Sequence, residues 1–210
     1  MIVELREDNF SKIISINEQV KNLTLMSASI RLQALNALIL SLKSGNEAAA
    51  FEVVAKEVIH FSKKVDILCG SNLILVKELV RNSSNQILFL KKNKVWQRTQ
   101  RINNHKMLGD FIKNKIEILN KKEKSEIEQS NLILKELFID LKQSEKIFLE
   151  GKMISIQTKI EGAHMSHLSS LFEDIAVKFE NVIEKMQDYV IKIQVLIKEV
   201  RNENNSRDLH

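Results

Sequence analysis

The chain has 210 residues, no proline and only five glycines, and 44% of its residues are hydrophobic. Proline removes a backbone donor and clashes with the preceding helical turn, so its absence favours long helices and excludes folds that need many tight turns. The net charge of +5 favours an acidic partner, and the single cysteine, Cys69, excludes an internal disulfide and favours a reducing compartment.

Three segments carry apolar residues at alternating spacings of three and four, the pattern of helices that pack along one face. The first row consists of Ile13, Ile16, Val20, Leu23, Ser27, Ile30, Ala34 and Ala37. The second row consists of Phe51, Val54, Val58, Phe61, Val65, Leu68, Asn72, Leu75 and Leu79. The third row consists of Leu168, Phe172, Ile175, Phe179, Val182, Met186, Tyr189, Ile193, Leu196 and Val200. A single helix cannot bury such a row, so each needs partner helices, from the same chain or from another. We predict an all-α fold of long antiparallel heptad-patterned helices that form a coiled-coil hairpin and a helical bundle.

Polar and glycine-containing segments predict where the helices end. Residues 44–47, with Gly45, predict a tight turn between antiparallel helices. Residues 81–85 and 103–105 predict two further breaks, and Gly151 and Gly162 predict kinks or helix ends. Cys69, which precedes Gly70 in an apolar setting, is predicted to be an inert buried thiol, and Asn72 of the second row is predicted to be a polar core residue that fixes the register of the helices.

These breaks divide the chain into three predicted parts. Residues 1–80 form a helical hairpin, residues 81–109 form a basic connecting segment, and residues 110–205 form a C-terminal helical module.

Specific residues surround the first predicted turn. They are Ala34-Leu35-Asn36-Ala37, a base at Lys43, Gly45, and Phe51-x-Val-Val-Ala-x-Glu-Val58, spaced without a gap. This pattern resembles the cytoplasmic signalling hairpin of methyl-accepting chemotaxis proteins, the bacterial chemoreceptors, and the resemblance is clear over residues 28–62. It implies a hairpin that dimerises into a four-helix bundle, clusters at its tip and engages a coupling protein and a histidine kinase.

The resemblance also implies which residues bind partners. Leu32, Leu35, Asn36 and Val53 would form the clustering surface, with Lys43 in place of an arginine and Glu57 on the returning helix. The chain departs from the family at Leu40, where the family has a glutamate, and at Ala49, where it has an arginine. Two functions stay open. The chain is either a diverged, soluble chemoreceptor-like signalling protein or a structural or scaffolding coiled-coil protein. In the second case it has lost kinase coupling and docks on an acidic partner through residues 81–106.

A cluster of bases surrounds the only tryptophan. Its members are Lys91, Lys92, Lys94, Trp96, Arg98 and Arg101, and there is no acid between Glu78 and Asp110. The cluster could be a solvated helix face with Trp96 buried in the bundle, a site for an acidic protein or an anionic membrane surface, or a nucleic-acid site where Trp96 stacks on a base. The solvated face is preferred among these, and nucleic acid is least favoured.

Nothing in the sequence predicts catalysis, a cofactor or a metal site. It contains no phosphate-binding loop, nucleophile elbow, HExxH or CxxC pattern. His164 and His167 are three apart and would share one helix face as two metal ligands, but no further ligand has a fitting spacing. No apolar run reaches the ~20 residues that cross a bilayer, and the N-terminus does not resemble a signal peptide, so a cytoplasmic location is expected.

Overall fold

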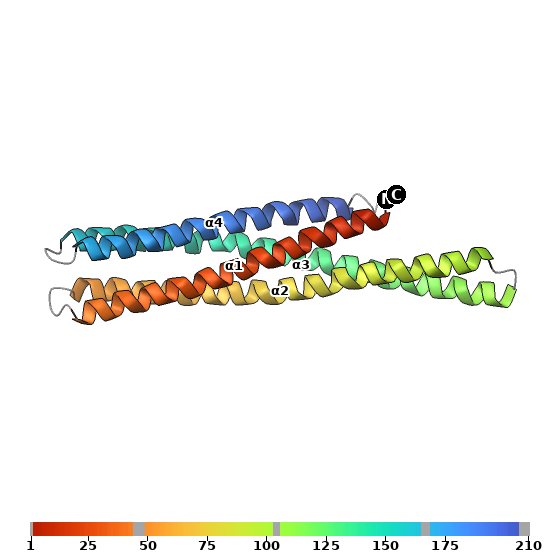
Figure 1. Ribbon diagram of the computed structural model, residues 1–210, viewed down its shortest axis with the longest axis horizontal. Helices are drawn as coiled ribbons and strands as arrows, with labels where there is room; N and C mark the ends of the chain where they lie inside the picture. The colour runs from red at the N-terminus through yellow and green to blue at the C-terminus, as the bar shows by residue number, and fades with distance from the viewer. Residues whose placement is uncertain (1, 44–48, 103–105, 165–168, 206–210) are drawn as a thin grey trace. The chain divides into compact units, whose positions relative to one another are not determined.

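The computed structural model consists of four long helices (Figure 1). They are α1 (Ile2–Lys43), α2 (Ala49–Ile102), α3 (Lys106–Ala163) and α4 (Ser169–Asn205). The structure describes residues 2–43, 49–102, 106–164 and 169–205, and within these ranges it contains no strand. The predicted all-α fold of long helices is therefore confirmed.

The helices form two compact units, and each helix contributes to both. Unit 1 comprises Met1–Asn17, Ile74–Leu137 and Val195–His210, and unit 2 comprises Glu18–Leu73 and Phe138–Gln194. These units cut across the predicted parts 1–80, 81–109 and 110–205, so a division of function among those parts stays a prediction.

In unit 2 the apolar rows are buried against other helices of the same chain. The α1 residues of the first row that lie in this unit are all buried: Val20, Leu23, Ser27, Ile30, Ala34 and Ala37. On α2, the buried Phe61 ring meets Phe179 of α4 edge-on, with 5.3 Å between the ring centroids. Between α3 and α4, the Ser155 hydroxyl donates to the Ala176 carbonyl over 3.1 Å. The partner helices that the rows require are thus supplied within the chain.

The buried stripe on α2 and α4 is wider than the predicted rows. Leu75, Ile175 and Val182 are half-buried, whereas their neighbours Val76 and Ile183 are buried. A helix in a four-helix bundle faces two neighbours, so positions beside the heptad row also enter the core.

The break predicted at residues 81–85 is wrong, because α2 continues through them. Asn82, Ser83 and Gln86 are buried in unit 1. The Gln86 amide nitrogen donates to the Ser130 hydroxyl over 3.0 Å and to the Glu126 carbonyl over 3.2 Å. Two of the polar residues that suggested a loop, Asn82 and Ser83, belong instead to a polar section of the core.

The remaining predicted breaks have different outcomes. Residues 44–47 and 103–105 lie outside the described residues. Gly151 lies inside the continuous helix α3, so no helix ends there. Gly162 is the penultimate residue of α3, which confirms the helix end predicted at that position.

Against the sequence expectation, one described helix is long and apolar enough to cross a membrane by length and composition, over Arg6–Leu42 of α1. Core helices of soluble proteins and N-terminal signal sequences pass the same test, and 28% of the apolar window is buried. The cytoplasmic location stays a prediction.

Candidate protein-interaction site

The outer side of α1 carries a surface that is poor in charge. Between residues 25 and 42 the only charged residue is Arg31, which pairs with Asp66 of α2 over 3.2 Å. Five large apolar side chains in this segment are exposed, at positions seven apart in two adjacent series: Leu25, Leu32 and Ile39, and Leu35 and Leu42. A spacing of seven keeps each series on one side of a helix, here away from the buried row.

The partner-binding residues predicted on α1 belong to this surface. Leu32 is 63% exposed and Leu35 is 44% exposed, and Asn36 beside them is also exposed. Lys43 is the last residue of α1, and its side chain lies outside the described residues.

The partner-binding residues predicted on α2 lie in its first turns. Val53 is 55% exposed, and Glu57 one turn later is exposed as well. Ala37 and Ala55 belong to one core cluster with Phe172, so these turns of α1 and α2 lie at the same level of unit 2. We call Leu32, Leu35, Asn36, Val53 and Glu57 the hairpin-end face.

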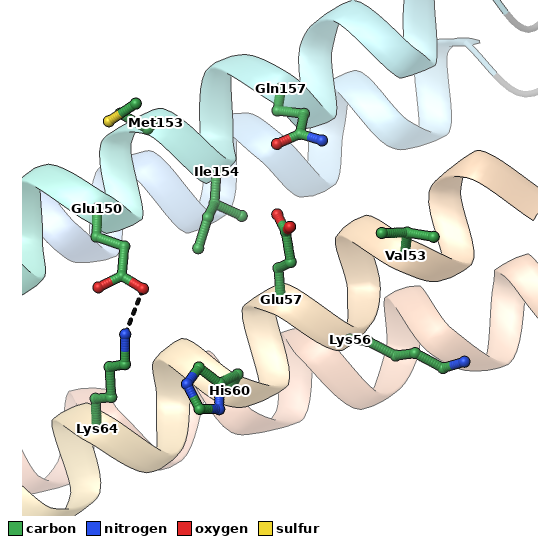
Figure 2. A pocket seen from close by; sticks show the side chains of 9 residues that line it. All are labelled: Val53, Lys56, Glu57, His60, Lys64, Glu150, Met153, Ile154 and Gln157. Carbon is green, nitrogen blue, oxygen red and sulfur yellow. Dashed lines mark hydrogen bonds and ion pairs between the residues drawn. The ribbon is translucent and has the colours of Figure 1, made fainter.

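A shallow groove of about 650 Å³ between α2 and α3 adjoins this face (Figure 2). Its lining residues are Val53, Lys56, Glu57, His60 and Lys64 from α2, and Glu150, Met153, Ile154 and Gln157 from α3. The buried side chain of Ile154 forms its floor, and the exposed Val53 and Met153 add apolar surface. Two residues of the hairpin-end face thus also line a groove that the sequence did not predict.

Charges of both signs surround the groove. Lys64 and Glu150 form an ion pair of 2.6 Å between α2 and α3, and Figure 2 shows the Glu57 carboxylate extending toward α3. Lys56 pairs along α2 with Glu52, also over 2.6 Å. An apolar floor with a rim of mixed charge suits the apolar side of an amphipathic partner helix, which brings polar residues of both signs to the rim.

Only one of the two metal-site candidates lies among the described residues. His164 is an exposed residue in the turn after α3, and His167 lies outside the described residues. Across the part of the chain that the structure describes, no group of three His, Cys, Asp or Glu side chains is placed to hold a metal ion.

The bases that were predicted to cluster around Trp96 on α2 lie in unit 1 and are exposed. They are Lys91, Lys92, Lys94, Arg98 and Arg101. Trp96 is half-buried and meets Phe111 of α3 edge-on, at 6.2 Å between ring centroids. The prediction of a solvated basic face with Trp96 buried in the bundle is therefore partly right. The bases are exposed, but Trp96 packs against one aromatic ring of the adjacent helix and not into a bundle core.

Further bases on α3 lie alongside this segment and were missed by the sequence reasoning. The Asn93 amide donates to the Asn120 side-chain oxygen over 2.6 Å, which pairs the end of α2 with the start of α3. This pairing brings the exposed Lys113, Lys115 and Lys121 next to the α2 cluster. Sequence spacing alone does not reveal it, because it depends on the antiparallel register.

No family model, curated protein or solved structure matches this chain. The resemblance to chemoreceptors therefore rests on the residues of the hairpin alone.

Proposed function

We propose that this chain is a non-enzymatic helical-bundle protein that binds partner proteins through the hairpin-end face. The observation that carries the proposal is that Leu32, Leu35 and Val53 are exposed while the apolar rows of α1 and α2 are buried within the chain. Large exposed apolar side chains on one side of a helix with little charge, as over residues 25–42 of α1, are typical of interaction sites.

All four helices of the bundle come from one chain, and this supports the assignment. In the family that the hairpin resembles, two chains contribute two helices each to the bundle. Here α3 and α4 take the place of the second hairpin in unit 2, as the Phe61–Phe179 contact illustrates. The buried row then needs no second copy, and the exposed face remains for a different protein.

A signalling role is the first candidate for this interaction. The retained Ala34-Leu35-Asn36-Ala37 motif presents Leu35 and Asn36 to solvent and buries Ala34 and Ala37. That is the division of roles a receptor-like tip requires, with small residues in the core and larger ones toward a partner. The coupling protein and histidine kinase of the chain's own organism are the partners that this candidate predicts.

Scaffolding without kinase coupling is the second candidate. It is favoured because all four helices of the bundle come from one chain. It is also favoured because Leu40 and Ala49 replace a glutamate and an arginine of the family. In this candidate the exposed bases of residues 81–106 supply the docking contact with an acidic partner.

The test combines capture with sedimentation of the purified full-length chain. The purified coupling protein and kinase serve as bait, and Leu32→Asp and Leu35→Asp place a charge in the face without disturbing the core. Ile191→Asp on α4 is the matched control, since Ile191 is also exposed and lies away from this face.

The signalling candidate is supported if the Leu32 and Leu35 variants lose capture while the Ile191 variant retains it. A monomer that captures neither protein contradicts it. Capture that all three variants retain contradicts the assignment of the binding face.

A further inference from the structure

Unit 1 contains a paired-helix section with an unusual charge. Residues 91–122 hold ten Lys or Arg and two acids, a net charge of +8, whereas the rest of the chain has a net charge of −3. We call residues 91–102 of α2 and 106–122 of α3 the basic arm. In this arm every Lys and Arg side chain is exposed.

The arm continues beyond the four-helix part of unit 1. Arg6 near the start of α1 bonds to Gln86 and Glu123, and Asn204 at the end of α4 bonds to Asn131. Past these contacts α2 and α3 run on as a pair (Figure 1). The contacts that join them there are Asn93 with Asn120 and Trp96 with Phe111, described above.

Large apolar side chains are exposed near the far end of the arm. Ile102, the last residue of α2, is 82% exposed, and Met107, the second residue of α3, is 89% exposed. Leu108 and Phe111 are exposed on the next turn of α3. By the register of Asn93 with Asn120, these side chains lie at about the same level of the helix pair.

Bases adjoin these apolar side chains directly. Arg101 precedes Ile102, and Lys106 precedes Met107. The Lys115 ammonium lies 5.3 Å from the centre of the Phe111 ring. Large apolar side chains ringed by Lys and Arg are what an anionic lipid surface selects, because the apolar groups enter the acyl boundary while the bases meet the headgroups.

We propose that the basic arm binds an anionic lipid bilayer with the exposed Ile102 and Met107 side chains inserted. These two side chains decide between this surface and nucleic acid. Contacts to phosphates would use the bases and a stacking ring, but Trp96 already packs against Phe111, and nothing in nucleic-acid binding would account for exposed Ile102 and Met107.

The single tryptophan gives a direct readout on the unmodified full-length chain. Vesicles of phosphatidylcholine with a phosphatidylserine fraction are titrated into the protein, and Trp96 emission and co-sedimentation are recorded. We expect binding to these vesicles, a shift of Trp96 emission to shorter wavelength, and release at high salt, because salt screens the headgroup attraction. Pure phosphatidylcholine vesicles should bind far more weakly.

Two sets of variants separate the apolar from the charged contribution. Ile102→Ser with Met107→Ser should weaken binding to anionic vesicles by about tenfold or more, since both side chains lose the acyl boundary. Replacing Lys91, Lys92 and Lys94 by Gln should weaken it by about fivefold for each charge removed near the surface. The matched controls are Ile67→Ser and Leu132→Ser, which change exposed side chains outside the arm and should leave binding unchanged.

Three outcomes would overturn the proposal. One is no binding to anionic vesicles, and another is binding that the Ile102 and Met107 variants retain in full. The third is a change of Trp96 emission on addition of single-stranded oligonucleotide or of polyglutamate, with no change on addition of anionic vesicles. A change with the oligonucleotide would assign the arm to nucleic acid, and a change with polyglutamate would assign it to an acidic protein. Because the arm lies outside the hairpin-end face, failure here leaves the capture experiment unaffected.

Discussion

Gly151 shows most clearly how one residue sets the packing of unit 2. A Cβ atom at this position would lie 2.7 Å from the Phe61 ring and from the Ile183 side chain. Because the Phe61 ring is fully buried and packs against Phe179, it cannot move away freely. Glycine is therefore required here by the close approach of α2 and α4 and not by the backbone of α3.

Gly151→Ala should destabilise the protein by about 1–3 kcal/mol, since overpacking outweighs the better helix propensity of alanine. The matched control is Gly70→Ala, where a Cβ meets nothing within 4 Å. That change should stabilise by about 0.5–1 kcal/mol. Thermal unfolding followed by circular dichroism measures both, and a stabilising Gly151→Ala would contradict the packing described here.

Cys69 is buried, as the sequence predicted. Burial, with a smaller contribution from the negative charge of Asp66, raises the pKa of its thiol from 9.0 to about 12. The thiolate is the reactive form, so the folded protein should react with a disulfide reagent at neutral pH far more slowly than the unfolded chain. Equal rates in the presence and absence of denaturant would show that Cys69 is accessible.

The same shift gives a stability change with a defined sign. Because the pKa of the Cys69 thiol is higher in the folded state, the unfolded chain loses its proton first as pH rises. This contribution to stability is complete below pH 9.0 and is lost as the pH approaches about 12. Cys69→Ala should therefore show a smaller fall of the melting temperature than the wild type over that range.

At the scale of the helices, much of α1 could be predicted and part of α2 could not. The α1 row from Ile13 to Ala37 is buried as expected, because aliphatic spacing reports directly on the face of an amphipathic helix. The α2 segment 81–85 looked like a loop because its residues are polar. The partner that stabilises Gln86 in the helix, Ser130, is 44 residues away, and no local pattern contains it.

Asn72 is a buried amide in the core of unit 2. It is fully buried, and neither atom of its amide has a hydrogen-bond partner in the described part of the chain. Asn72→Leu should raise the free energy of unfolding by about 1–2 kcal/mol, because it removes unpaired polar atoms and keeps the volume filled. Asn72→Ala leaves a void and should not. A loss of stability in the leucine variant by chemical denaturation would indicate that Asn72 has a bonding partner.

Arg6 joins α1 to α2 and α3 in unit 1. Its guanidinium donates to Gln86 over 3.1 Å and to Glu123 over 3.2 Å, and little of either charged side chain is exposed. Arg6→Ala should cost about 3 kcal/mol, because it leaves the largely buried Glu123 without this base. Arg31→Ala removes a more exposed pair with Asp66 and should cost less than about 1 kcal/mol. Equal losses in a denaturant titration would contradict this ranking.

For the whole molecule, the composition predicted the helices, but it did not predict whether their partner helices come from the same chain. The rows indicated only that each helix needs neighbours, and the structure supplies these within the chain. The groove by Val53 and Met153 and the lysines of the basic arm depend on the register between α2 and α3. The sequence did not fix that register, because the apolar spacing of residues 110–160 is mixed.

If the hairpin-end face meets a partner protein, a probe on it should respond when that protein binds. A nitroxide spin label at Leu35→Cys in a Cys69→Ala background provides this probe, with the same label at Ile191→Cys as the control. Both native side chains are exposed, so both labels should be mobile in the isolated protein. On addition of the purified coupling protein and kinase, we expect the label at position 35 to be immobilised and the label at position 191 to stay mobile. Two labels that both stay mobile, or that are both immobilised to the same degree, would contradict it.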